Sequence, residues 1–233
     1  MCELLTVAYE SPQRLGPLLD RALDVERYGV DGFGWGVAWL DVDDGRGIRV
    51  QGYRKVISLA EDGDGRRRLS DVASVRFLIH LRRPSLLSTV QLADTQPFVD
   101  RDGRFAFAHN GRFDHHDRYR ERFGSALEGR ADSEVGFALF RAELEHETPR
   151  RALAATLAKL GGYGNLVYLG DHGEIVAIGA HYQNPFWRFR LDGAAVACTA
   201  FHSEDRSLFE LVFTDARDEV PVGRTAEIVA PPL

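Results

Sequence analysis

Cysteine and long apolar runs are scarce in this sequence. There are two cysteines among 233 residues, Cys2 and Cys198, which is too few for a disulfide scaffold and gives no sign of an oxidising compartment. No apolar run approaches the ~18 residues that a membrane helix needs. The early acidic residue Glu3 also differs from the basic start of a signal peptide. We therefore expect a cytoplasmic protein with no membrane partner.

An excess of positive charge is also missing. The formal net charge is −6, so the chain has no global basic field and nucleic acid is not expected as a partner. No cysteine pair is spaced for a metal, and the neighbouring histidines His115 and His116 lack a third ligand at a suitable spacing. We expect neither a metal nor an organic cofactor.

The composition and the hydrophobic pattern predict one α+β domain over residues 1–233. The chain shows no internal repeat and no linker long enough to divide it. Helical spacing of apolar residues predicts helices over 15–26, 133–147 and 149–160, whereas 61–68 is expected to be a charged loop. The strand-like segments are residues 2–7, 32–40, 48–56, 75–81, 105–109, 165–169, 174–178, 187–191, 194–199, 208–214 and 226–229. Many strands with two helical clusters indicate a layered α+β domain.

A cysteine at position 2 suggests a catalytic role for the chain start. Removal of Met1 by an aminopeptidase, which acts when the next side chain is small, would place a thiol and a free α-amine on Cys2. The α-amine titrates near ~8 and a free thiol near ~8.5, so the amine can accept the thiol proton directly or through a water. Cys2 is therefore a candidate nucleophile that carries its own base. The alternative is an incidental cysteine.

Three further segments carry residues suited to binding a small polar substrate. The side-chain NH2 of Asn110 and the backbone N–H of Gly111 are suited to an oxyanion hole, and a plain Asn-Gly hairpin turn is the alternative. Arg82 follows an apolar strand and is suited to gripping a carboxylate, unless it is simply an exposed arginine. Asp132 either pairs with an ammonium group or caps the helix that follows it.

Taken together, these groups describe the recognition of one kind of substrate. A thiolate, an oxyanion hole, a carboxylate clamp and an ammonium clamp match a free amino acid with a γ-carboxamide, which is glutamine. Attack of the thiolate on Cδ would release ammonia, and water would then hydrolyse the γ-glutamyl thioester.

The order of the motifs resembles the class II glutamine amidotransferase family, whose members are N-terminal-nucleophile hydrolases. The matching segments are Met1–Leu5, Asp31–Gly36, His80–Arg82, Asp94–Phe98, Phe107–Gly111, Gly129–Glu134 and Gly161–Val167. The match covers most of the chain. It implies a four-layer αββα sandwich with two antiparallel sheets in the middle.

The resemblance also implies a role for each matching residue. The catalytic set is Cys2 as the nucleophile with Asn110 and Gly111 as the oxyanion hole. The substrate-binding set is Arg82 for the α-carboxylate, Asp132 for the α-amine, and Ser85. The glycine-rich segment Gly32–Gly36 is expected beside the active site.

Two departures from the family pattern lie close to the expected substrate pocket. The chain reads Arg83-Pro84-Ser85 where the family often has a small residue and Thr, and Gln96 replaces the usual His of Asn-x-His-Pro-Phe. The length resembles a stand-alone branch that includes the ergothioneine-pathway γ-glutamyl amidohydrolase and the glutathione-degrading amidotransferase-like subunit. These proteins cleave γ-glutamyl amides with larger leaving groups.

The sequence therefore leaves three functions open. The substrate is glutamine, or it is a larger γ-glutamyl compound, or the chain is a catalytically silent subunit on the same fold. A second copy of the chain and a synthase subunit both remain open as partners.

Overall fold

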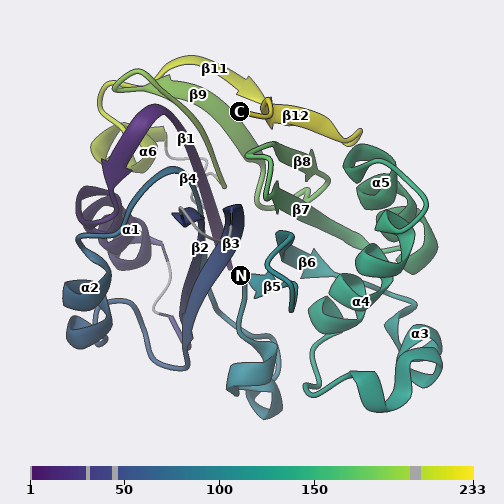
Figure 1. Cartoon of the computed structure of the whole chain (residues 1–233). Coiled ribbons are helices and arrows are strands. Elements are labelled where there is room, and N and C mark those ends of the chain that lie inside the picture. The colour runs from purple at the N-terminus through teal and green to yellow at the C-terminus, as the bar shows by residue number, and fades with distance from the viewer. Residues whose placement is uncertain (1, 30–31, 44–46, 200–205) are drawn as a thin grey trace.

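The strands of the protein form two antiparallel sheets that face each other (Figure 1). The computed structural model describes residues 2–29, 32–43, 47–199 and 206–233, and the statements below concern these residues. The larger sheet has the order β11-β9-β10-β1-β4-β2-β3, and the smaller sheet has the order β12-β8-β7-β6-β5.

The strand bounds are as follows. The larger sheet contains β1 (Glu3–Arg14), β2 (Trp35–Asp43), β3 (Gly47–Lys55), β4 (Ala73–Leu81), β9 (Phe186–Leu191), β10 (Ala194–Thr199) and β11 (Arg217–Pro221). The smaller sheet contains β5 (Phe98–Val99), β6 (Phe105–Arg112), β7 (Tyr163–Gly170), β8 (Ile175–Gly179) and β12 (Glu227–Ala230).

Helices cover the outer face of each sheet (Figure 1). Beside the larger sheet lie α1 (Gly16–Tyr28), α2 (Gly63–Leu69) and α6 (Arg206–Val212). Beside the smaller sheet lie α3 (His116–Phe123), α4 (Asp132–Leu144) and α5 (Pro149–Leu160). No helix in the described ranges is long and apolar enough to cross a membrane.

Three hydrophobic clusters hold the four layers together, one at each interface. Strand β6 shows how the sequence builds two of them. Its side chains alternate, so that Phe105 and Phe107 pack against the helices while Ala106 and Ala108 face the other sheet. The large residues fill the space between helix and sheet, and the small ones let the two sheets approach. The expected four-layer αββα sandwich is confirmed.

The structure corrects two predicted elements. The segment 61–68 is not a loop, because Asp62 accepts a hydrogen bond from the backbone N–H of Gly65 at 3.0 Å and caps helix α2. The predicted strand at 208–214 overlaps α6, in which Phe209 and Val212 are buried at helical spacing, and the buried Phe213 follows directly after the helix.

Most other predicted elements agree with the structure to within a few residues, but β1 continues to Arg14, seven residues past its predicted end. Helices α1, α4 and α5 lie where apolar spacing predicted them, whereas α3, β5 and β11 were not predicted. The connection between β2 and β3 includes residues 44–46, which lie outside the described residues. Cys198 is buried in β10.

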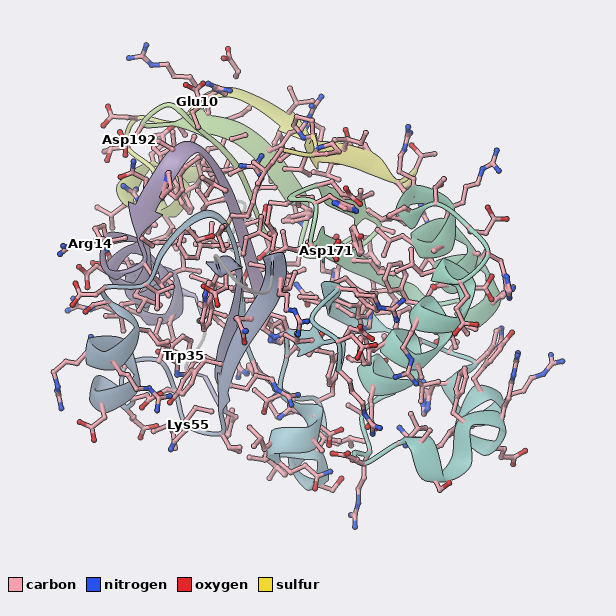
Figure 2. All side chains as sticks on the ribbon, viewed as in Figure 1. Glu10, Arg14, Trp35, Lys55, Asp171 and Asp192 are labelled. Atoms are coloured by element: carbon pink, nitrogen blue, oxygen red, sulfur yellow. The ribbon has the colours of Figure 1, made fainter. Side chains whose placement is uncertain are left out.

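Charged side chains project from the outside of the molecule, whereas Trp35 lies within its layers (Figure 2). Arg14 pairs with Asp71 at 3.1 Å and Arg190 with Glu10 at 3.9 Å, and these pairs are largely exposed. Exposed ion pairs of this kind contribute little to stability. The fold therefore depends on its three apolar interfaces.

Leu78→Ala tests the importance of the interface between the sheets. Leu78 is 0% exposed, so we expect truncation to lower the free energy of unfolding by about 2–5 kcal/mol because it leaves a cavity. The matched control is Leu87→Ala, since Leu87 is 74% exposed and its loss should change stability by no more than about 0.5 kcal/mol. Urea unfolding measures both, and equal effects would contradict the assignment.

Candidate active site

A cavity of about 680 Å³ lies where strand ends from both sheets meet. It is lined by the residue before β1, the loop after β4, the end of β6 and the start of α4. The six site residues predicted from the sequence all line it, and they are Cys2, Arg82, Ser85, Asn110, Gly111 and Asp132. The tertiary structure thus brings together residues from distant parts of the chain.

Cys2 lies at one wall of this cavity and is partly exposed. Its Sγ accepts a hydrogen bond from the backbone N–H of Arg83 at 3.3 Å. Burial raises the pKa of the Cys2 thiol above its usual value, and the Arg83 N–H and the charge of Arg82 lower it less. The thiol is therefore mainly protonated at neutral pH, so attack by its sulfur requires a base. Met1 lies outside the described residues, and its removal remains a prediction.

A buried polar network holds the backbone of Cys2 from behind. The Nδ2 of Asn184 donates to the Cys2 carbonyl at 3.1 Å and to Glu3 Oε2 at 3.4 Å. The hydroxyl of Thr199 donates to the same oxygen of Glu3. Sequence reasoning missed Asn184, because it lies 182 positions from Cys2 and only the fold brings the two together.

Glu3 is 2% exposed within this network. Burial raises the pKa of its carboxyl to about 8, although hydrogen bonds from Thr199 and Asn184 act in the opposite direction. Glu3 is therefore mainly protonated at neutral pH. A neutral Glu3 avoids placing a second negative charge next to a Cys2 thiolate.

Asn110 and Gly111 lie inside a strand and do not form a turn. Strand β6 continues to Arg112 and pairs antiparallel with β7, so the hairpin-turn alternative is wrong. Asn110 is 2% exposed, and its Nδ2 has no hydrogen-bond partner among the described residues. A buried amide without a partner is costly unless a ligand satisfies it.

Glycine is required at position 111. The backbone there has φ +155°, and a Cβ atom would lie 2.2 Å from the carbonyl oxygen of Tyr163 and 2.4 Å from the Cα of Gly164. These are backbone atoms of the paired strand β7, which cannot move away cheaply. The close approach keeps the Gly111 backbone beside Asn110 at the cavity wall.

The strand end that carries Asn110 is fixed by its neighbours. The side chain of Gln96 bonds both backbone groups of His109, donating to its carbonyl at 3.0 Å and accepting from its N–H at 2.6 Å. The His109 ring stacks on Phe113 with centroids 3.9 Å apart, and its Nδ1 lies 3.1 Å from Ser133 Oγ. Burial lowers the pKa of His109, so the ring is neutral. Gln96, one of the departures noted above, therefore has a structural part in the site.

Arg82 is buried at the cavity wall, so the alternative of an exposed arginine is wrong. It is 4% exposed, and its Nη2 donates to Thr89 Oγ1 at 2.8 Å. Its Nη1 has no hydrogen-bond partner in the described part of the chain. Burial lowers the pKa of Arg82, but a guanidinium stays charged in proteins. A buried cation with a free donor is suited to an anionic ligand.

The glycine-rich segment flanks Arg82. The Arg82 N–H donates to the Gly34 carbonyl at 2.8 Å, and the Phe33 N–H donates to the Arg82 carbonyl at 2.8 Å. Asp31, in the same motif, lies outside the described residues. The described residues of this segment contact Arg82 but do not line the cavity.

Asp132 is the first residue of α4 rather than its cap. Ala131 occupies the N-cap position, so the capping alternative is wrong. The Oδ2 of Asp132 accepts the N–H of Phe113 at 2.8 Å, which holds the carboxylate at the cavity wall. Ser85 is exposed and lines the same cavity.

The loop before Asp132 is held by two buried carboxylates. Asp94 accepts the backbone N–H groups of Arg130 and Ala131, both at 2.8 Å. Glu134 accepts the N–H groups of Glu128 and Gly129 at 2.7 and 2.9 Å. These bonds use both acidic side chains internally, so they shape the cavity wall. Among the residues described, no cluster of His, Cys, Asp and Glu could hold a metal ion.

Solved structures of two other proteins share this fold. Glutamine phosphoribosylpyrophosphate amidotransferase from B. subtilis, complexed with ADP and GMP, superposes with a TM-score of 0.71 at 16% identity over 100% of this chain and 50% of that one. A glutamine aminotransferase class-II domain protein from Silicibacter pomeroyi superposes with a TM-score of 0.62 at 21% identity over 99% of this chain and 100% of that one.

The sequence then identifies the family. The profile of the class-II glutamine amidotransferases matches residues 1–187, so the chain belongs to this family. A structure described as the allosteric regulatory enzyme of purine biosynthesis is also similar, with a TM-score of 0.68 at 17% identity over 100% of this chain and 50% of that one. The chain thus spans about half the length of two of these structures. No curated protein matches its sequence.

The buried Glu3 predicts a pH-dependent stability. Its pKa is about 8 in the folded state against the usual 4.5, so between these values the folded protein binds more protons than the unfolded chain. Stability should therefore fall as pH rises from about 5 to 8. Glu3→Gln keeps a neutral polar side chain and should flatten that part of the slope.

The measurement is the melting temperature across this pH range. The exposed variant Glu121→Gln is the control and should keep the wild-type slope. An unchanged slope in Glu3→Gln would show that Glu3 does not carry an abnormal titration.

Proposed function

We propose that this protein is a Cys2-dependent amidohydrolase acting on the γ-carboxamide of glutamine or of a γ-glutamyl compound. After removal of Met1, the α-amine of Cys2 accepts the thiol proton and the sulfur bonds to Cδ of the substrate. The C–N bond then breaks, and the leaving nitrogen takes the proton. Water hydrolyses the γ-glutamyl thioester, which releases glutamate and restores the thiol.

Two buried, unsatisfied donors in the cavity with Cys2 carry this proposal. The free Nδ2 of Asn110 is suited to the oxyanion that develops on the attacked carbonyl, together with the Gly111 N–H. The free Nη1 of Arg82 is suited to the α-carboxylate of the substrate. A γ-glutamyl group presents both of these oxygens at once.

The remaining charge in the wall complements the same substrate. Asp132 offers a carboxylate to the α-ammonium group, opposite in sign to Arg82. The raised pKa of the Cys2 thiol is consistent with a base that acts at the moment of attack. The free α-amine of the same residue is that base in the proposal.

The size of the cavity favours a γ-glutamyl amide larger than glutamine as the second candidate. Its volume of about 680 Å³ lies in the range of sites for drug-sized ligands. Glutamine is smaller than such ligands, so the cavity has room for a larger leaving group than ammonia. A silent subunit is the third alternative, and it predicts no turnover even after removal of Met1.

Cys2→Ala tests the nucleophile, with Cys198→Ala as the matched control. Intact mass first establishes that Met1 is absent. Release of glutamate from glutamine and γ-glutamyl peptides should then fall about a thousandfold or more in Cys2→Ala, because no thioester forms. Cys198 is buried in β10 away from the cavity lining, so its variant should stay close to wild type. Equal activity of the two variants would refute the proposal.

Asn110→Ala tests the oxyanion donor against Asn165→Ala on the paired strand. We expect kcat to fall about 10²–10³-fold in Asn110→Ala with little loss of stability, since its Nδ2 has no hydrogen-bond partner among the residues that the structure describes. Asn165 donates to the Asn184 carbonyl at 2.8 Å and accepts the His181 N–H at 3.3 Å, so its loss should lower the melting temperature. Unchanged kcat in Asn110→Ala would remove Asn110 from the proposed mechanism.

A further inference from the structure

Three exposed arginines surround the cavity in addition to the buried Arg82. They come from separate segments, each next to a residue of the proposed site. Arg83 carries the N–H that bonds Cys2 Sγ, Arg112 follows Gly111, and Arg130 lies in the loop before Asp132. Their convergence on one cavity is a product of the tertiary structure.

Few carboxylates balance these guanidinium groups. Asp94 and Asp132 are the carboxylates in the described cavity lining. Asp94 accepts two backbone N–H groups and the side chain of Gln91 at 2.9 Å, so its oxygens are already used. In the described ranges no carboxylate pairs with Arg83 or Arg130, and Arg112 has only the exposed Asp114 at 3.5 Å.

A γ-glutamyl group alone would leave the three exposed arginines without a bound anion. A γ-glutamyl group would use Arg82 for its α-carboxylate and Asp132 for its α-ammonium, which are one charge of each sign. Three cations then remain around the opening, although the whole chain has a net charge of −6. Like charges gathered in a cleft focus a field that favours an anion.

We infer that the substrate is a γ-glutamyl amide whose leaving group carries a negative charge, and that Arg83, Arg112 and Arg130 select it. This inference rests on the proposed function. Guanidinium groups bind carboxylates and other oxyanions through paired N–H donors. In this proposal the three arginines contact the leaving group, so they distinguish substrates that share the same γ-glutamyl group.

The test compares two substrates of equal size. γ-Glutamylglycine carries a carboxylate on its leaving group, and γ-glutamylglycinamide replaces it with a neutral amide. Wild-type protein lacking Met1 should show a kcat/KM about tenfold higher for the acid at low salt, and added NaCl should reduce that preference. Each of Arg83→Gln, Arg112→Gln and Arg130→Gln should lower the acid-to-amide ratio about two- to fivefold, as expected for exposed ion pairs.

Arg101→Gln is the matched control, because Arg101 is exposed and lies outside the cavity lining. Its acid-to-amide ratio should equal that of wild type. Hydrolysis of both substrates with equal kcat/KM would overturn this inference and leave the proposed function standing. A preference for the acid that survives in all three variants would also overturn it. Hydrolysis of neither substrate, nor of glutamine, would instead count against the proposed function.

Discussion

The face-to-face packing of the two sheets is the constraint on which the site depends. The interface is built from small and medium apolar residues, including Ala106 and Ala108 of β6 and Leu78 of β4. Because these side chains are short, the sheets approach closely and their strand ends open onto one cavity. Cys2 and Arg82 reach that cavity from the larger sheet, whereas Asn110 and Gly111 reach it from the smaller one. Neither sheet alone contains the proposed chemistry.

The side chains around the cavity fall into two groups, those that bind the protein backbone and those with a donor that has no partner among the described residues. Asp94, Glu134 and Gln96 use their side chains to hold backbone, and they define the shape of the wall. Asn110 and Arg82 instead each have one buried donor without a partner in the described part of the chain, and both residues line the cavity. Proteins rarely leave such groups unsatisfied, so their shared position points to a ligand that supplies two acceptors. This pattern supports the proposed γ-glutamyl substrate without reference to any relative.

The charged residues of the cavity add a second proposed basis for substrate selection. The inner pair, Arg82 and Asp132, is suited to the zwitterionic end that all γ-glutamyl compounds share. The three exposed arginines, Arg83, Arg112 and Arg130, pair with no carboxylate of the described cavity lining. In a chain with a net charge of −6, this local excess of positive charge favours an anionic ligand. In the proposal, Arg82 and Asp132 recognise the γ-glutamyl group, and the three exposed arginines recognise its leaving group.

The sequence by itself determined the layered class, and it picked out residues that the structure places around one cavity, because the chemistry of each is visible locally. Alternating and helical apolar periods revealed most strands and three helices, since these periods reflect which face each element buries. The glycines and charged residues of α2 led to the prediction of a loop, and the apolar residues of α6 led to the prediction of a strand. Local patterns also left turn, cap and surface alternatives open for Asn110, Asp132 and Arg82. Only the tertiary structure decided these, and only it placed Asn184 behind Cys2 and the three exposed arginines around one cavity, because such contacts join residues with no shared local period.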